Sequence, residues 1–310
     1  MPDRSAGADE DRSVQVDLTA VLVATVNGDP AVLTVGHAAA LPSGPLESGH
    51  RSLQAGLHDW VLQQTGHPLG YIEQLYTFAD RDRSGEEPGR RVISISYLGL
   101  TREEPQHSAA PGGWRNWYEF FPWEDHRYGA PAVVFDVIEP ALRQWAEAAD
   151  QEERRRKRLQ RAATAFGFDD RPWNEELVLQ RYELLYEAGL VEEGIHSNRQ
   201  ANARFVPGRT MNGDHRRILA TGIARLRTKI KYRPVVFELM PPSFTLLQLQ
   251  RTVEALAGMT VHKQNFRRLI EQQDLVEETG QMSADTGGRP AKLFRFRHAV
   301  LDERAVAGTK

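Results

Sequence analysis

The sequence predicts an α+β fold, in which a mixed region of strands and helices precedes a small helical unit with a β-hairpin. Three observations carry this prediction. Runs rich in β-branched residues, bounded by turn signals, mark strands in the first 140 residues. Charged helical segments follow over residues 141 to 203, and two short amphipathic helices and a hairpin pattern come after Pro241-Pro242. With 310 residues and 40% apolar composition, the chain is long enough for two domains with cores.

The first elements are a hairpin and a helix. Residues 1 to 13 are polar and acidic and predict a disordered tail. Residues 14 to 35 contain two β-branched runs around Asn27-Gly28, which favours a β-hairpin. From Ser52 the apolar residues follow helical spacing, and Gly66 supplies the stop. Further strands are predicted at residues 71 to 78, 91 to 100, around 117 to 121, and 132 to 137.

The middle of the chain is helical. Residues 141 to 203 contain charged helices separated by a break with proline, and an amphipathic helix follows over residues 214 to 230. The run at residues 152 to 158 is interpreted as a solvated helix face. We predict a first domain over residues 14 to 240 with a helical insertion at about 141 to 210, a second over 241 to 300, and a tail over 301 to 310.

The segment after Pro241-Pro242 has the pattern of a helix, a tight turn and a second helix. Ser243 or Thr245 can cap the first helix, whose apolar residues lie three and four apart, and Gly258 ends it. Thr260 is the expected cap of the next helix, whose polar and basic residues face outward. The alternative to a DNA-reading unit is a plain helical hairpin.

Two short apolar strands flanking a Gly-Gly turn then predict a basic wing. A helix-turn-helix places its second helix in the major groove, where Gln, Asn and Arg read base edges, while wing cations contact phosphates. Asn265 is equally compatible with a structural role. The candidates for DNA binding are Lys263, Gln264, Asn265, Arg267 and Arg268 on the helix, with Lys263, Gln264 and Arg267 for base contact, and Arg289, Lys292 and Arg295 on the wing.

The charge distribution agrees with a polyanion-binding C-terminal part. Residues 220 to 310 hold fifteen Lys and Arg against nine Asp and Glu, although the whole chain has a net charge of -3. A basic region on an otherwise acidic chain is where nucleic acid would bind. The chain has no cysteine, which excludes disulfides and thiolate metal sites. No apolar stretch approaches the roughly 18 residues of a membrane span, so we expect a cytoplasmic protein without a membrane partner.

These blocks resemble the Nudix-related transcriptional regulators of NAD metabolism, the NrtR type. The resemblance implies an N-terminal Nudix-like α/β/α sandwich that binds ADP-ribose or a related nucleotide, joined to a winged helix that binds double-stranded operator DNA as a homodimer. It is poor across residues 141 to 210. It rests on residues 232 to 238 (YRPVVFE), 244 to 250 (FTLLQLQ), 265 to 268 (NFRR), 288 to 291 (GRPA) and 294 to 296 (FRF), and it extends to residues 74 to 78, 81 to 83 and 92 to 100.

The resemblance also locates the positions that would hold a catalytic metal. Active Nudix enzymes place an Arg-Glu pair, then a Glu-Glu pair one turn later and X-Gly, so that carboxylates bind Mg²⁺ and activate water. Aligned on Gly66, these positions are Asp59 and Trp60, then Gln63 and Gln64. Amides are poor ligands for a hard divalent cation. We predict that hydrolase activity is lost, that no cofactor is required, and that Trp60 packs into the core.

Nucleotide binding does not require the metal-binding carboxylates that hydrolysis needs. An ADP-ribose pocket needs aromatic faces for adenine and basic groups for the diphosphate. The alternative is that the aromatic rings alternate into a sheet core and the arginines are solvated. The dense aromatic segment over residues 114 to 128 is expected to form a pocket lid or a dimer surface. The candidate ligand-binding residues are Tyr76, Phe78, Arg81, Arg83 and Tyr97.

Together these features predict a ligand-responsive DNA-binding transcriptional regulator, a repressor or an activator, with a catalytically inactive nucleotide sensor, and the resemblance implies that it acts on NAD metabolism. Nucleotide binding would change the relative placement of two winged helices in a dimer, and so their fit to a palindromic operator. One rival is a Mg-dependent Nudix ADP-ribose or nucleotide pyrophosphatase with an accessory winged helix. Another is a DNA-binding protein whose Nudix-like region serves only dimerisation.

Overall fold

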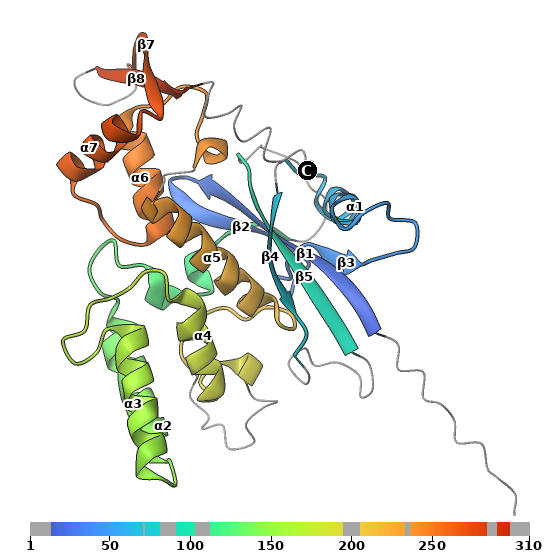
Figure 1. Ribbon diagram of the computed structural model, residues 1–310, viewed down its shortest axis with the longest axis vertical. Coiled ribbons are helices and arrows are strands. Elements are labelled where there is room, and N and C mark those ends of the chain that lie inside the picture. The colour runs from blue at the N-terminus through green and yellow to red at the C-terminus, as the bar shows by residue number, and fades with distance from the viewer. Residues whose placement is uncertain are drawn as a thin grey trace, which may run out of the picture.

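A computed structural model of the chain describes residues 14–70, 72–80, 91–102, 112–194, 205–232, 236–283 and 290–297. Its N-terminal part, which we call the sheet domain, is built on a mixed sheet of order β4-β5-β1-β2-β6, with β3 paired to β1 (Figure 1). Strands β1 and β5 run parallel, and the other neighbours are antiparallel. The strands are β1 (Val14–Val26), β2 (Asp29–Val35), β3 (Ser43–Pro45), β4 (Ile72–Phe78), β5 (Arg91–Leu100) and β6 (Gly112–Asn116).

The first hairpin forms as predicted. Its turn residues Asn27 and Gly28 both have positive φ, 53° and 86°. Positive φ at both central residues defines a type I′ turn, whose twist matches that of the two strands it joins. The turn therefore sets the register in which Val26 pairs with Asp29.

Helices cover both faces of this sheet (Figure 1). On one face lies α1 (Leu53–Thr65), capped by the Ser52 hydroxyl and ended by Gly66 at φ 69°, as predicted. On the other face lies α5 (His215–Tyr232). Successive residues of β1 point to opposite faces, so Leu22 packs beneath α1 and Val23 in the core on the α5 side. The predicted α/β/α sandwich is confirmed.

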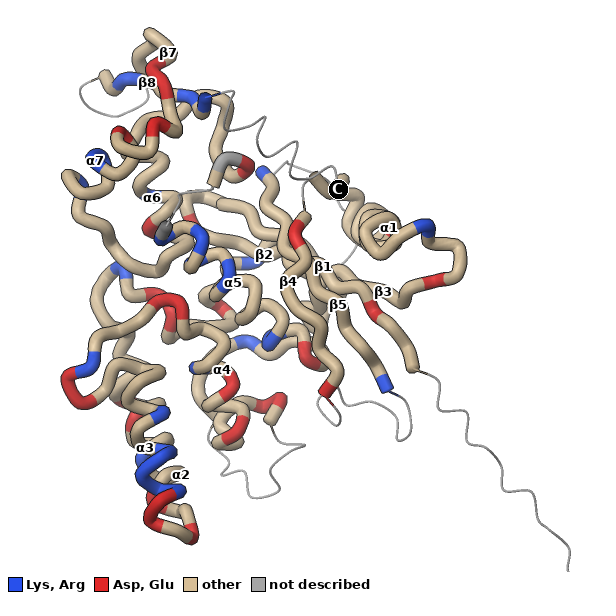
Figure 2. Tube along the Cα trace, in the orientation of Figure 1, with Lys and Arg blue, Asp and Glu red and all other residues tan. Residues whose placement is uncertain are grey.

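The predicted helical insertion contains three helices, α2 (Glu139–Glu147), α3 (Glu152–Phe166) and α4 (Val178–Glu187). The α2 and α3 pair projects away from the sheet, whereas α4 packs on α5 (Figure 1). In α3 two glutamates precede a continuous basic run at residues 154 to 158 (Figure 2). Exposed ion pairs join Arg155 to Glu147 at 2.6 Å and Lys157 to Glu153 at 2.6 Å. This surface is therefore a solvated, charge-paired face.

Two of the predicted strands are wrong. Residues 117 to 121 form the short 3-10 helix Trp117–Glu119 and the turn after it, which leads into a second 3-10 helix, Pro122–Glu124, and residues 132 to 137 belong to a helical segment with a π-helical turn at Val134–Ile138. Val134 and Ile138 are both buried, so this β-branched run meets the core with helical spacing. Tertiary packing overrides β-propensity here.

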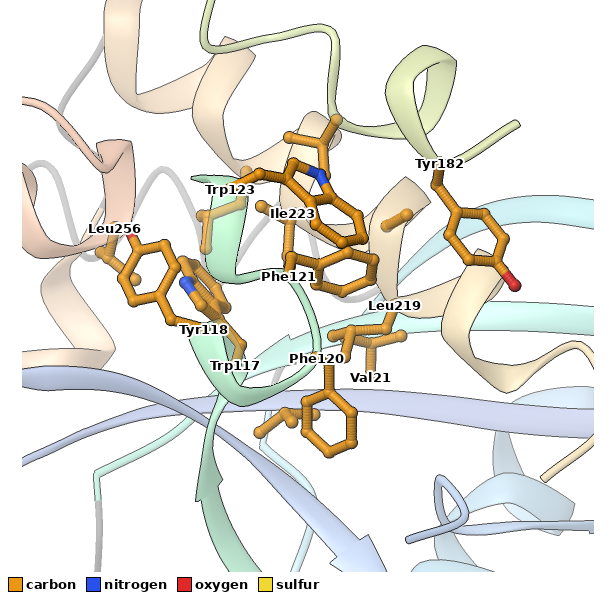
Figure 3. Packing of buried hydrophobic residues seen from close by; sticks show 14 of the residues in the cluster. Val21, Trp117, Tyr118, Phe120, Phe121, Trp123, Tyr182, Leu219, Ile223 and Leu256 are labelled. Carbon is orange, nitrogen blue, oxygen red and sulfur yellow. The ribbon is translucent and has the colours of Figure 1, made fainter. Parts of the chain in front are cut away.

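The aromatic segment is a core element. Trp117, Phe120, Phe121 and Trp123 are each 0% exposed and pack between the sheet, α5 and α4 (Figure 3). The expectation of a pocket lid or a dimer surface is wrong for these rings. Because all of them are buried, they wrap around a tight turn rather than alternate along a strand.

The C-terminal unit is a helix-turn-helix followed by a two-stranded hairpin. It consists of α6 (Leu246–Ala257), α7 (Lys263–Gln273), β7 (Val276–Ser283) and β8 (Ala291–Phe296). Of the two predicted caps, Thr245 is the one used, and Gly258 ends α6 in the left-handed region, as predicted. Thr245 also forms a capping box with Gln248. The prediction that Thr260 caps α7 is wrong. The cap is His262, because Glu254 accepts from Val261 N at 2.9 Å and holds the turn before the helix begins.

Short 3-10 turns at Glu192–Gly194 and Phe237–Leu239 complete the described structure. In the part of the chain that the structure describes, every helix is too short or too polar to cross a membrane.

Candidate functional site

The outer face of α7 carries the predicted reading residues. Phe266 and Ile270 are buried against the helical pair. The remaining side chains of the first two turns face solvent, and none of the cations among them forms an ion pair with a described residue. The exposed residues are Lys263, Gln264, Asn265, Arg267 and Arg268. A helix with this surface can present amide and guanidinium donors to base edges without first breaking an ion pair.

The cations of the wing are paired. Lys292 Nζ lies 2.8 Å from Glu278, and Arg295 Nε lies 2.7 Å from Glu277, both across the β7 and β8 ladder. These pairs are exposed, so each contributes little to stability and can exchange for a phosphate. Arg289 lies outside the described residues. Lys292 and Arg295 can therefore contact phosphates only in competition with these carboxylates.

A short backbone contact fixes the wing to the start of the helical pair. Phe244 N donates to Phe294 O at 2.9 Å, and Phe294 N donates to Phe244 O at 2.8 Å. The rings of Phe244 and Phe296 lie 4.8 Å apart. Wing and helices therefore form one packed unit.

Sequence reasoning missed Arg251. It is exposed on α6, and it forms no ion pair with a described residue. In a helix-turn-helix the first helix crosses the DNA backbone, where an arginine would contact phosphate. The sequence signal that could have identified Arg251 is its position on the polar face of the predicted amphipathic helix.

Of the four positions that would hold metal ligands in an active Nudix enzyme, two carry side chains that hydrogen-bond to the backbone of β3. Gln64 Nε2 donates to Ser43 O at 2.7 Å, while Gln64 Oε1 accepts from Ser43 N at 3.1 Å. Trp60 is half-buried over Gly44 and donates from Nε1 to Pro45 O at 2.9 Å. It thus packs on β3 at the edge of the core. Asp59 and Gln63 are exposed.

No group of three or more His, Asp or Glu side chains within the described ranges lies in an arrangement that could hold a metal ion. The amide of Gln64 fits its task because Ser43 offers both a donor and an acceptor. A carboxylate could satisfy only the donor.

The five candidate ligand residues do not line one common wall. Phe78 is 5% exposed and packs in the core on the α5 side, whereas Tyr97 is 3% exposed and packs beneath α1 on the opposite face. Burial raises the pKa of Tyr97. For these two rings the structure agrees with the alternative of a sheet core. Tyr76 is 57% exposed, its ring 5.0 Å from that of Phe78, and Arg81 and Arg83 lie outside the described residues.

An arginine that the sequence did not single out lies beside Phe78. The Arg217 guanidinium sits over the Phe78 ring at 4.8 Å. It is ion-paired with Asp80 at 2.6 Å, with Asp214 at 3.1 Å and with Glu183. An anionic ligand would reach Arg217 only by displacing a carboxylate.

The fold and these surfaces define a class of protein: a mixed-sheet sandwich, with no acidic group able to hold a metal ion among its described residues, joined to a winged helix with an exposed basic recognition helix. Residues 236–296 match the NrtR DNA-binding winged helix domain. This match confirms the resemblance that the sequence suggested for the C-terminal unit.

Among curated relatives, the ADPR responsive transcriptional repressor NtrR of Acinetobacter baylyi is 43% identical over 83 residues, which are 27% of this chain and 33% of that protein. The alignment thus spans a third of the length of the relative. The crystal structure of Shewanella oneidensis NrtR matches 91% of this chain and 94% of its own, with TM-score 0.53 and 19% identity. A MutT/nudix family protein from Enterococcus faecalis matches 92% and 88%, with TM-score 0.52 and 17% identity. The two structures confirm the fold class, a Nudix-type sandwich followed by a winged helix.

Proposed function

We propose that this protein is a DNA-binding transcriptional repressor that responds to ADP-ribose or a related nucleotide. The observation that carries the proposal is the exposed face of α7, where Lys263, Arg267 and Arg268 have no ion-pair partner among the described residues. The winged-helix match over residues 236–296 and the similarity to the ADPR responsive transcriptional repressor of Acinetobacter baylyi support it. A homodimer on a palindromic operator, control of NAD metabolism and a cytoplasmic location belong to the same proposal.

We further infer that the sandwich senses its ligand without hydrolysing it. Amides stand at residues 63 and 64, and the Gln64 amide is engaged with the Ser43 backbone. No cofactor is required in this proposal. The proposed ligand surface includes exposed Tyr76, with Arg81 and Arg83 from the segment that follows β4 in the sequence. Phe78 supports the Tyr76 ring from within the core, whereas Tyr97 is buried on the opposite face of the sheet and is not part of this surface.

The test is fluorescence anisotropy with duplexes that the full chain selects from a random pool, at fixed salt, with and without ADP-ribose. We expect tight binding to a palindromic duplex, weak binding to a scrambled duplex of the same composition, and a change in affinity on adding ADP-ribose. Absence of any selected sequence would overturn the regulator. Hydrolysis of ADP-ribose with Mg²⁺, followed in parallel, would favour the pyrophosphatase instead.

A further inference from the structure

The C-terminal end of α6 is held by groups of the sheet domain. Tyr118 Oη donates to Ala255 O at 2.7 Å, Arg227 Nε donates to Leu256 O at 3.1 Å, and His126 N donates to Gly258 O at 2.7 Å. The last carbonyls of a helix have no partner within the helix and must find donors elsewhere. In this chain the donors to the last carbonyls of α6, the first helix of the DNA-reading unit, come from the sheet domain.

The arginine in this contact belongs to a buried charge cluster. Glu124 is 1% exposed, and Arg181 and Arg227 are each 0% exposed. Arg181 donates to both oxygens of Glu124 at 2.5 and 2.8 Å, and Arg227 donates to one of them at 2.6 Å. Burial alone would raise the pKa of Glu124, but the two guanidinium groups hold it below its ordinary value. The carboxylate is therefore charged, and it fixes both arginines.

The cluster and the helix end are electrostatically complementary. Taken alone, the two arginines and the glutamate carry one net positive charge in a buried site, and Asp125 and Glu175 lie near enough to interact with Arg227 and Arg181. The C-terminus of a helix carries a partial negative charge, because its carbonyls point along the axis. The end of α6 thus supplies part of the compensation that the cluster lacks. Moving α6 away would leave Arg227, Tyr118 and the His126 amide without these acceptors.

The cluster also joins the helical insertion to the reading unit. Arg181 lies on α4, and its guanidinium stacks on the ring of Trp173 at 3.8 Å. That ring stacks on His126 at 3.8 Å, and the backbone of His126 donates to Gly258. The insertion is thus connected to α6 by two series of contacts, one through Glu124 and one through Trp173.

The contact leaves no room at the end of α6. A Cβ on Gly258 would lie 2.4 Å from Glu124 O and 2.6 Å from a nitrogen of Arg227. Gly258 also has φ +71°, which disfavours other residues. Close approach and backbone conformation therefore both require glycine at this position.

We propose that Glu124, Arg181 and Arg227 form a joint that fixes the orientation of the winged helix on the sheet domain, and that the helical insertion acts on the DNA-reading unit through Arg181. These are positioning residues. The consequence for DNA binding rests on the proposed function, whereas the docking of α6 does not. A ligand that changes the placement of the winged helix must either move α5 and this cluster with it or break the hydrogen bonds to the end of α6.

The experiment uses the full chain and hydrogen exchange of the backbone amides in peptides covering residues 246 to 258 and 120 to 128. Arg181→Met removes one guanidinium and keeps the stem, and Tyr118→Phe removes one hydrogen bond from the joint without changing the shape of the ring. Arg161→Met is the matched control, because Arg161 is exposed and makes a two-point contact with Glu187 in the same insertion. DNA binding of each variant is measured on the selected duplex and, at low salt, on a scrambled one.

We expect both joint variants to speed exchange in these two peptides by about tenfold, while Arg161→Met stays within about twofold of the parent. Affinity for the selected duplex should fall by about fivefold or more in the joint variants, and low-salt binding to the scrambled duplex should persist because the α7 cations are intact. Parent-like exchange in folded Arg181→Met and Tyr118→Phe would overturn the joint. If the parent binds no DNA selectively, the proposed function fails, and the exchange measurement still decides the joint.

Discussion

At the scale of single residues, the chemistry at the end of α1 is set by the difference between an amide and a carboxylate. Gln64 forms a closed pair of hydrogen bonds with the backbone of Ser43. Gln63, its neighbour, is exposed to solvent. Residues 63 and 64, which align with a metal-binding Glu-Glu pair, thus differ in their surroundings. Gln64 has a structural role and Gln63 is exposed to solvent, so substitutions at the two positions should differ in their effect on stability.

We predict that Gln64→Glu lowers the free energy of unfolding by about 1 to 3 kcal/mol, because it removes a donor and faces Ser43 O with a charge. Gln63→Glu should stay within about 0.5 kcal/mol of the parent, as exposed substitutions do. Urea denaturation measures both. The double variant should still not hydrolyse ADP-ribose with Mg²⁺. Equal stability of the two single variants would contradict the role assigned to Gln64.

A second residue-scale prediction concerns pH. Burial lowers the pKa of His215 to about 4, and its neutral Nδ1 accepts from Leu41 N at 2.9 Å. Between pH 6.5 and 4 the unfolded chain binds a proton at this residue and the folded chain does not. The free energy of unfolding should therefore fall by about 3 kcal/mol as the pH drops through this window, and not change through this group above it. His215→Gln keeps an acceptor without a titratable ring. Denaturation curves of this variant should lack that part of the slope, and a slope equal to the parent's would refute the assignment.

At the scale of elements, α7 and the wing have different electrostatic states. The exposed cations of α7 have no ion-pair partner in the described structure, whereas Lys292 and Arg295 on β8 are neutralised by Glu278 and Glu277 on β7. Recognition by the helix and phosphate contact by the wing therefore respond differently to substitution.

For the helix, Arg267→Ala should weaken binding to the selected duplex by about 1 to 3 kcal/mol and relax the preferred sequence, if its guanidinium contacts a base in two places. Anisotropy against a panel of single-base variants of the duplex measures this loss. Loss of affinity that is equal for all sequences would instead make Arg267 a phosphate contact.

For the wing, Glu278→Gln should strengthen DNA binding regardless of sequence, because Lys292 then meets phosphate without first leaving a carboxylate. Lys292→Ala should reduce the slope of log affinity against log salt by about 0.9. A salt titration of both variants supplies the readout. Lys157→Ala, on the charge-paired α3, is the control and should leave the slope unchanged. An unchanged slope in Lys292→Ala would remove the wing from the DNA contact.

At the scale of the whole molecule, effector and DNA binding are linked in the proposed function. If ADP-ribose changes DNA affinity by a given factor, DNA must change ADP-ribose affinity by the same factor. We predict this equality from calorimetric titrations of ADP-ribose into the free and the DNA-bound protein. Sedimentation should give a dimer in both states. Equal ADP-ribose affinities of the free and the DNA-bound protein would mean that the two ligands do not affect each other, which would contradict ADP-ribose as the effector.

The sequence by itself determined the local elements whose signals are short-range. The Asn27-Gly28 turn, the helix that starts after Ser52 and stops at Gly66, and the cap at Thr245, one of the two residues proposed for it, all formed as predicted, because each depends on groups within a few residues. The amphipathic helices of the winged unit belong with them, and so does the face of α7 that carries its cations. These features were sufficient to predict the fold class.

Only the tertiary structure decided the identity of long-range contacts. Residues 117 to 121 and 132 to 137 have strand composition but fold as helical turns, because their rings and branched side chains fill a core supplied by distant segments. The burial of Phe78 and Tyr97 on opposite faces depends on which helix covers each face of the sheet. The cluster of Glu124, Arg181 and Arg227 joins residues that are up to 103 positions apart. No sequence periodicity encodes such a contact, since it exists only when three separate elements pack together.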